Sequence, residues 1–188
     1  MVFEDFKQKD SLVIVYTGEG KGKTSASLGL MVRALGTDWN VAFIQFIKVW
    51  EVGEHKFIQA IMPIYKQKLT FYKGGLGFFK AGELSSKASN QEHVAEAKRT
   101  YQVALKAATS GEYRLVICDE INNAVKDGLL TAADLDALID SKHPITSLCL
   151  TGRNFPSALL QKVDIATDMT KIKHHFDDKY IANKGIDY

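Results

Sequence analysis

The residues best suited to chemistry form one short loop, in which three glycines stand at every second position just before the pair Lys-Thr. Glycines let a backbone curl so that its amides point inward toward an anion, and lysines add positive charge. A helix that starts after the loop would direct the positive end of its dipole to the same point. The stretch predicts a phosphate-binding loop, with the candidate nucleotide-binding residues Gly18, Glu19, Gly20, Lys21, Gly22, Lys23, Thr24 and Ser25.

The strict phosphate-loop pattern, a glycine and four residues before Gly-Lys-Thr or Gly-Lys-Ser, is missed by one position. The first glycine of the pattern would fall at Thr17, and Gly18 follows one residue later. The context still fits, because an apolar run leads in and a helical pattern leads out. Lys23 is then placed to bridge phosphate oxygens, and the Thr24 hydroxyl to ligate Mg²⁺ or Mn²⁺. The alternative is a glycine-rich turn with solvated lysines.

An acidic pair supplies the partner that such a loop needs for its metal ion. The apolar run "LVIC" ends in Asp119 and Glu120, a position typical of the acidic strand end in phosphate-loop enzymes. We expect one carboxylate to hold Mg²⁺ directly or through water, and the other to bond Thr24 or a lysine. The alternative is that both carboxylates cap the helix that follows.

Further candidates follow other expected strands, whose carboxyl ends meet at one edge of a parallel sheet. Arg153 of "TGRN" either clamps phosphate or pairs with a local carboxylate. Gln45 and Lys48 of "QFIK" are candidate substrate contacts, although Lys48 could equally be an exposed lysine. Phe78 and Phe79 stand in a glycine-rich loop and offer a flat apolar surface to a ligand, unless at least one of them tucks into the core.

Length and composition set broad limits on the class of protein. With 188 residues, one domain over 1–188 is expected. A net charge of +2 argues against a nucleic-acid binder that works by bulk charge. The two cysteines, Cys118 and Cys149, stand in apolar runs and are expected to be buried, reduced thiols. No secretory signal is visible, and no apolar run approaches the roughly 18 residues of a membrane span, so a cytoplasmic protein is expected.

Apolar runs alternate with helical patterns along the chain. Strands are expected at 11–16, 40–47, 68–73, 113–120, 145–150 and 163–169. Helices are expected at 23–36, at 53–62 with a stop near Pro63, at roughly 87–109, and after a capping box formed by Thr131 and Asp134. Several strands are nearly continuous Val, Ile and Leu, which is typical of a sheet covered on both faces. The alternation predicts a parallel α/β sandwich with right-handed crossovers.

Five stretches occur in the order seen in the P-loop corrinoid adenosyltransferases: "TGEGKGKTSASLG", "VAFIQFIK", "LVICDE", "TGRN" and the closing "KGIDY". The chain resembles that family from about Val13 to its end. The resemblance implies a RecA-like P-loop fold with a mainly parallel sheet of about six strands, helices on both faces, and a homodimer. It also implies transfer of the 5′-deoxyadenosyl group of ATP to the cobalt of a reduced corrinoid (cob(I)alamin or a cobinamide-type compound), with release of triphosphate.

The resemblance also implies roles for residues. The loop from Gly18 to Thr24 would hold the triphosphate, reversed relative to kinases, and Thr24 and Glu120 would contact Mg²⁺. The residues expected to carry the reaction are Lys23, Glu120 and Arg153. Family members use loop aromatics to displace the lower axial ligand of cobalt, which makes the cobalt easier for an electron donor to reduce.

The chain departs from the family pattern at two points. Phe78 matches the loop phenylalanine, but Lys80 stands where members often have tryptophan. Either Phe79 substitutes for that tryptophan or the loop works differently. Members also often carry a longer N-terminal segment than the ten or so residues that precede the first expected strand here.

Three other function classes compete with this reading. A P-loop ATPase or small-molecule kinase would usually carry an arginine-bearing lid, whereas 73–90 contains no arginine. A non-catalytic nucleotide-binding module, such as a corrinoid carrier, would be favoured by loss of Lys23 or Glu120, and both are present. A DNA-dependent ATPase is disfavoured by the nearly neutral charge.

Overall fold

A single parallel sheet organises the protein. The computed structural model describes residues 5–77, 79 and 87–188 of the chain. Within this part, six strands pair in the order β3-β2-β4-β5-β1-β6, and every neighbouring pair is parallel. The strands are β1 (Val13–Thr17), β2 (Val41–Gln45), β3 (Leu69–Lys73), β4 (Leu115–Asp119), β5 (Ser147–Thr151) and β6 (Ile165–Asp168).

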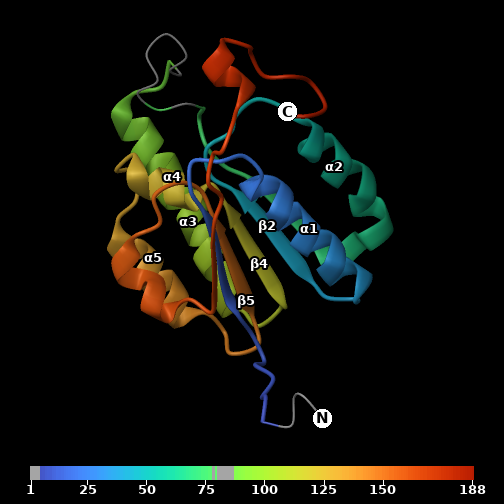
Figure 1. Ribbon diagram of the computed structural model, residues 1–188. Coiled ribbons are helices and arrows are strands. Elements are labelled where there is room, and N and C mark those ends of the chain that lie inside the picture. Colours follow the sequence, from blue (N-terminus) through green and yellow to red (C-terminus); the bar gives the residue numbers. More distant parts are fainter. Residues whose placement is uncertain (1–4, 78, 80–86) are drawn as a thin grey trace.

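Helices cover both faces of this sheet (Figure 1). One face carries α1 (Lys23–Gly36) and α2 (Gly53–Tyr65), and the other carries α3 (Asn90–Thr109), α4 (Ile121–Lys126) and α5 (Ala132–Ser141). Short 3-10 helices complete the described elements: η1 (Lys66–Lys68), η3 (Ser157–Lys162) and η4 (His175–Asp178). The expected α/β class with a parallel sheet of six strands is confirmed, and the arrangement is that of a RecA-like P-loop fold.

Alternation along each strand divides the core into two layers. Phe43 of β2 packs with residues of α1 and α2, whereas its neighbour Ile44 packs with α3, α4 and α5, because successive side chains of a strand point to opposite faces. Cys118 and Cys149 are buried, unpaired thiols in opposite layers, as the sequence predicted. The central strands are mainly apolar because both of their faces are covered.

Local chemistry accounts for some of the helix boundaries. The capping box predicted at Thr131 is present, since the Asp134 N–H donates to Thr131 Oγ1 over 3.2 Å and the Thr131 N–H donates to Asp134 Oδ2 over 2.7 Å. The expected stop of α2 near Pro63 was wrong, because the helix continues to Tyr65. A proline disrupts only the turn before it, and α2 ends within one turn after it, at Tyr65, where the next residue, Lys66, has a φ of 43°.

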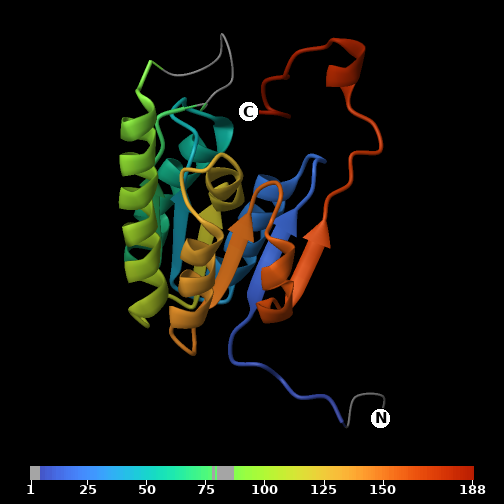
Figure 2. The same cartoon turned by 90° about the vertical axis from the view of Figure 1, so that its left-hand side faces the viewer.

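The carboxyl ends of the strands share one edge of the sheet. A final stretch, residues 169–188 and here termed the C-terminal segment, rises from β6 above this edge and curls back over it (Figure 2). Its end lies near the start of α2, where a side chain added at Gly53 would come within 3.7 Å of the Tyr188 backbone. Among the described residues, no helix is long and apolar enough to cross a bilayer.

Candidate functional site

The phosphate loop, residues 18–24, joins β1 to α1 and packs against the end of β6. Gly18 has a φ of 95°, and a side chain there would overlap Asp168 and Met169. The Gly20 N–H donates to the Met169 carbonyl over 2.5 Å. Position 18 requires glycine, because its backbone is left-handed and Asp168 and Met169 leave no room for a side chain. The loop is thus held in shape from outside, by the first residues of the C-terminal segment.

The start of α1 is prepared for an anion. Its N-cap is Gly22 with a φ of 112°, no side chain caps the helix, and its first turn contains no acidic residue. The first amides of a helix have no partner within the helix, so they can donate to a phosphate. Lys23 Nζ curls over the loop and donates to the carbonyls of Gly18 and Gly20 over 2.7 and 2.6 Å. Burial, followed by the charge of Arg153, lowers the pKa of Lys23.

Asp119 ends β4 and is surrounded by donors. Thr151 Oγ1 donates to Oδ1 over 2.7 Å, while Gln45 Nε2 and Thr24 Oγ1 donate to Oδ2 over 3.0 and 3.3 Å. The Asp119 side chain is completely buried. Of the two carboxylates, Asp119 is therefore the one that bonds Thr24. Gln45 is also completely buried, so the structure places it beneath the cleft as a support for Asp119 and not at a substrate-contacting surface.

Glu120 occupies the adjacent position and faces the cleft. Its φ of 63° turns the chain sharply, and its N–H donates to Thr151 Oγ1 over 2.9 Å. Its carboxylate accepts from Asn123 Nδ2 over 3.2 Å and lies 4.0 Å from Lys48 Nζ. Burial and the neighbouring Asp119 raise the pKa of Glu120, against the opposing charge of Lys48. A cation beside this carboxylate would stabilise its ionised form.

Lys48 forms part of the wall of the same cleft. Its Nζ lies 2.9 Å from Glu54 Oε1 in the first turn of α2, and its side chain is 16% exposed. Burial alone would lower the pKa of Lys48, but the charges of Asp119, Glu120 and Glu54 outweigh it and raise the pKa. The alternative of a freely exposed lysine does not hold. Lys48 places a fixed positive charge between two acidic groups.

Arg153 follows β5 at the rim of the cleft. Its guanidinium lies 3.2 Å from Glu19 Oε2 of the phosphate loop, and both side chains are largely exposed. Its backbone N–H donates to Asn123 Oδ1 over 2.6 Å, which orients the turn. The local carboxylate partner considered for this arginine is thus present, and the guanidinium remains among the residues that line the cleft.

The aromatic loop is only partly described. Phe78 and Lys80 lie outside the described residues. Phe79 is half-buried against the layer formed by α3, α4 and α5, and its ring centroid lies 5.1 Å from that of His93. Phe79 thus packs against the core instead of projecting freely from its loop.

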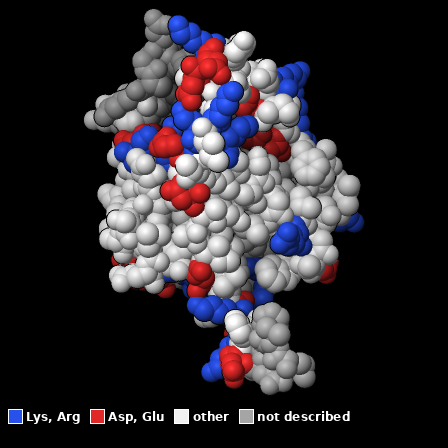
Figure 3. Space-filling model, in the orientation of Figure 1, with Lys and Arg blue, Asp and Glu red and all other residues white. Residues whose placement is uncertain are grey.

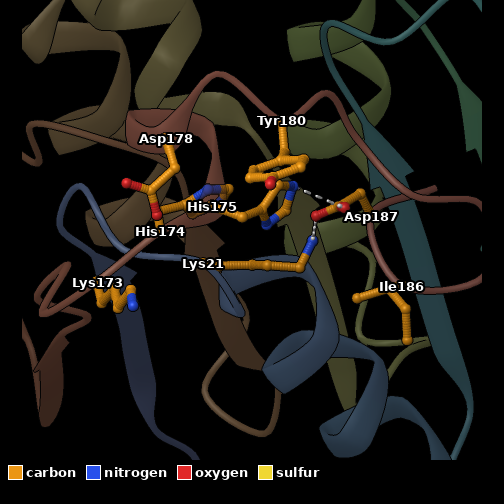
Figure 4. Close-up of a pocket in the computed structure, with 8 residues that line it drawn as sticks. All are labelled: Lys21, Lys173, His174, His175, Asp178, Tyr180, Ile186 and Asp187. Atoms are coloured by element: carbon orange, nitrogen blue, oxygen red, sulfur yellow. Dashed lines mark ion pairs between the residues drawn. The ribbon is translucent and has the colours of Figure 1, made fainter.

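A cleft of about 1330 Å³ lies between the phosphate loop, Glu120, the start of α2 and the C-terminal segment. Charged side chains gather over this edge of the molecule, whereas the middle of the same face is mainly uncharged (Figure 3). Figure 4 shows a smaller pocket that shares Lys21 and Asp187 with this cleft, and in it the ion pair of 2.5 Å between Lys21 Nζ of the phosphate loop and Asp187 Oδ1 of the C-terminal segment. An N–H from Asn183 and the Lys21 charge lower the pKa of Asp187.

The donors at the cleft suit a hard divalent cation. The Thr24 hydroxyl and the Glu120 carboxylate line the cleft and are oxygen ligands, which Mg²⁺ prefers together with waters and phosphate oxygens. In the described part of the chain, no group of three or more His, Cys, Asp or Glu side chains could hold a metal ion.

The participants that were not anticipated from the sequence include Thr151, His55 and Asp187. Thr151 holds both Asp119 and Glu120, and its only signal was its place directly before the glycine of "TGRN". His55 lies beneath the acidic pair, in hydrogen-bond contact with Gln45. Asp187 belongs to the closing stretch "KGIDY", which carried a resemblance but no role at the site.

Comparison with known proteins gives one consistent result. A family model described as ATP:corrinoid adenosyltransferase BtuR/CobO/CobP matches residues 9–188. A corrinoid adenosyltransferase of Pseudomonas aeruginosa is 28% identical over 97% of this chain and 86% of its own length. One from a Sinorhizobium species is 31% identical over 94% of this chain and 80% of its own length. Corrinoid adenosyltransferase CobA of Salmonella typhimurium is 27% identical over 97% of this chain and 88% of its own length.

Proposed function

The chain belongs to the ATP:corrinoid adenosyltransferase family and is a transferase, and we propose that it transfers the 5′-deoxyadenosyl group of ATP to the cobalt of a reduced corrinoid, with release of triphosphate. The observation that carries this proposal is the convergence, at one cleft, of an uncapped helix start with Lys23, the Glu120 carboxylate, and a Thr24 hydroxyl that bonds the buried Asp119. This combination suits a metal-bound polyphosphate.

The proposed reaction uses the cleft mainly to position ATP and to stabilise its leaving group. Cobalt(I) is itself a strong nucleophile and attacks the 5′ carbon of the ribose. The cobalt–carbon bond forms as the carbon–oxygen bond breaks, and the electron pair of that bond leaves with the triphosphate. The loop amides, Lys21 and Lys23 would neutralise the departing charge. A bound Mg²⁺ would add positive charge at the same phosphates, held by Thr24 and Glu120.

Further roles belong to the same proposal. Arg153 would exchange Glu19 for a phosphate oxygen, and Lys48 would turn from Glu120 toward nucleotide or substrate. Phe78 and Phe79 would act on the corrinoid from their loop. An electron donor that reduces the cobalt, and a second copy of the chain in a homodimer, complete the expected partners.

The test is an anaerobic incubation of the protein with chemically reduced cob(I)alamin and MgATP. We expect a light-sensitive adenosylated corrinoid and triphosphate in equal amounts. An unchanged corrinoid with accumulating ADP would instead support the alternative of a P-loop ATPase or small-molecule kinase.

A further inference from the structure

A chain of buried hydrogen bonds runs from α2 to the phosphate loop. His55 Nε2 contacts Gln45 Oε1, Gln45 Nε2 donates to Asp119 Oδ2, and Thr24 Oγ1 donates to the same oxygen. The exposed fractions of His55, Gln45 and Asp119 are 1%, 0% and 0%. Because water does not reach these groups, each depends on its neighbours in the protein for its partners.

The donor and the acceptor of each hydrogen bond in this series follow from the groups at its two ends, the Val52 N–H and the Asp119 carboxylate. The Val52 N–H donates to His55 Nδ1 over 3.4 Å, so Nδ1 is the acceptor and the ring proton resides on Nε2. Nε2 then donates to the Gln45 oxygen, which turns the Gln45 amide nitrogen toward Asp119. A carboxylate can only accept, so the opposite amide orientation would place two acceptors face to face. Burial, followed by the charge of Lys73, lowers the pKa of His55, in keeping with a neutral ring.

The series of hydrogen bonds ends at the Thr24 hydroxyl, which is expected to hold the cation. Asp119 is held on one oxygen by Thr151, so its other oxygen is directed at Gln45 and Thr24. When the Thr24 hydroxyl donates its hydrogen to Asp119, its lone pairs remain available to a cation. A partner that orients a ligand in this way commonly tunes the affinity of a metal site.

We propose that His55 and Gln45 are positioning residues for the metal–nucleotide site, because they orient Asp119 so that it accepts the hydrogen of Thr24. This inference rests on the proposed function, since it requires a metal-bound nucleotide at Thr24. Neither side chain touches the nucleotide; both act through Asp119.

The test measures how much Mg²⁺ strengthens ATP binding, by calorimetric titration with and without the metal. His55→Leu should lose about tenfold of the Mg²⁺-dependent gain in ATP affinity, whereas binding without metal stays unchanged. His143→Leu is the matched control, because His143 Nδ1 also accepts a backbone N–H, from Ile145 over 3.4 Å, away from the site. His55→Gln should restore the gain, since its terminal amide can present an N–H near the position of Nε2.

The outcomes separate the two proposals. If the wild-type protein shows the Mg²⁺-dependent gain and His55→Leu keeps all of it, the positioning role is refuted while the proposed function stands. Equal losses of the Mg²⁺-dependent gain in His55→Leu and His55→Gln would also refute the positioning role. Such a result would mean that the His55 ring only fills space and that its N–H is not needed. A wild-type protein that neither binds MgATP nor transfers the adenosyl group would refute the proposed function itself.

Two further measurements keep the inference testable if His55→Leu does not fold. Gln45→Met retains most of the side-chain volume, removes the amide and should lose the same gain. Nitrogen-15 NMR of the unaltered protein should show a neutral His55 ring with its proton on Nε2. A charged ring, or a proton on Nδ1, would overturn the proposal without any variant.

Discussion

The carboxylate of Asp187, next to the last residue of the chain, lies 2.5 Å from the ammonium of Lys21 at the tip of the phosphate loop. The C-terminal segment thus neutralises a charge that a triphosphate would also use. The Asp187 side chain is only 9% exposed, while that of Lys21 is 42% exposed. The contact therefore combines a held carboxylate with a lysine that can turn to another partner.

We expect Asp187→Asn to tighten the binding of inorganic triphosphate by about three- to fivefold, because it removes a carboxylate that competes with the ligand for Lys21. Calorimetric titration at low salt measures this change. Asp136→Asn is the control, because it removes the ion pair between Asp136 of α5 and Lys162 of η3, and it should leave the affinity for triphosphate unchanged. Weaker binding by Asp187→Asn would mean that the segment must stay docked for the ligand to bind.

Lys23→Met should lower kcat/KM for adenosyl transfer by at least about a hundredfold, because it would remove a charge that we propose stabilises the leaving group. The fold should survive, since the Lys23 ammonium bonds only carbonyls of its own loop among the contacts described. Single-turnover kinetics and circular dichroism measure the two effects. Lys106→Met, an exposed lysine in the last turn of α3, should change neither. Normal turnover by Lys23→Met would contradict the phosphate role.

Gly18→Ala and Gly29→Ala should have opposite effects on the free energy of unfolding. At Gly18 the added carbon meets Asp168 and Met169 on a left-handed backbone, which should cost about 2 kcal/mol or more. Gly29 lies within α1 with nothing within 4 Å of the added carbon, so alanine should stabilise by about 0.5–1 kcal/mol. Urea unfolding of the two variants measures the difference. Equal stability of both would show that the loop yields at Gly18.

Asp134→Asn should destabilise the protein by about 1 kcal/mol at pH 7 and by nothing in strong acid. Burial would raise the pKa of Asp134, but Lys98 and Thr131 outweigh it and lower the pKa below its ordinary 3.8. A carboxyl pKa that is lower in the folded protein stabilises the fold at pH values above the ordinary pKa. That contribution is lost as the pH falls through the pKa of the folded protein. Thermal unfolding from pH 7 down to pH 2 measures it. If Asp134→Asn were still less stable than the unaltered protein in strong acid, the effect would come from the geometry of the side chain and not from its charge.

The strands and the meeting of Gly18, Asp119 and Arg153 at one edge could be predicted because they follow from local pattern. Continuous apolar runs predict covered strands, and parallel strands place their carboxyl ends together. The predicted strand ends fall within a few residues of the observed ones. By contrast, α4 has only six residues, too few for a helical period to stand out.

The support beneath the acidic pair could not be predicted, because its partners come from separate segments. His55 is a lone histidine on α2, and nothing near it in sequence indicates that Gln45 of β2 is its partner. Which of Asp119 and Glu120 bonds Thr24 was also open from sequence. The left-handed backbone at Glu120 decides it, by turning that side chain into the cleft while Asp119 stays in the sheet.

The three donors of Asp119 have a consequence for how the protein reaches its native state. Thr24, Gln45 and Thr151 lie 95, 74 and 32 residues away along the chain. Such distant pairs form only after long stretches of chain have been closed into loops, and sheets built from them fold slowly. The carboxylate thus acquires its full set of partners only when β1, β2, β4 and β5 are in register. In a refolding experiment, recovery of metal-dependent nucleotide binding should coincide with the slowest global phase, not with early helix formation.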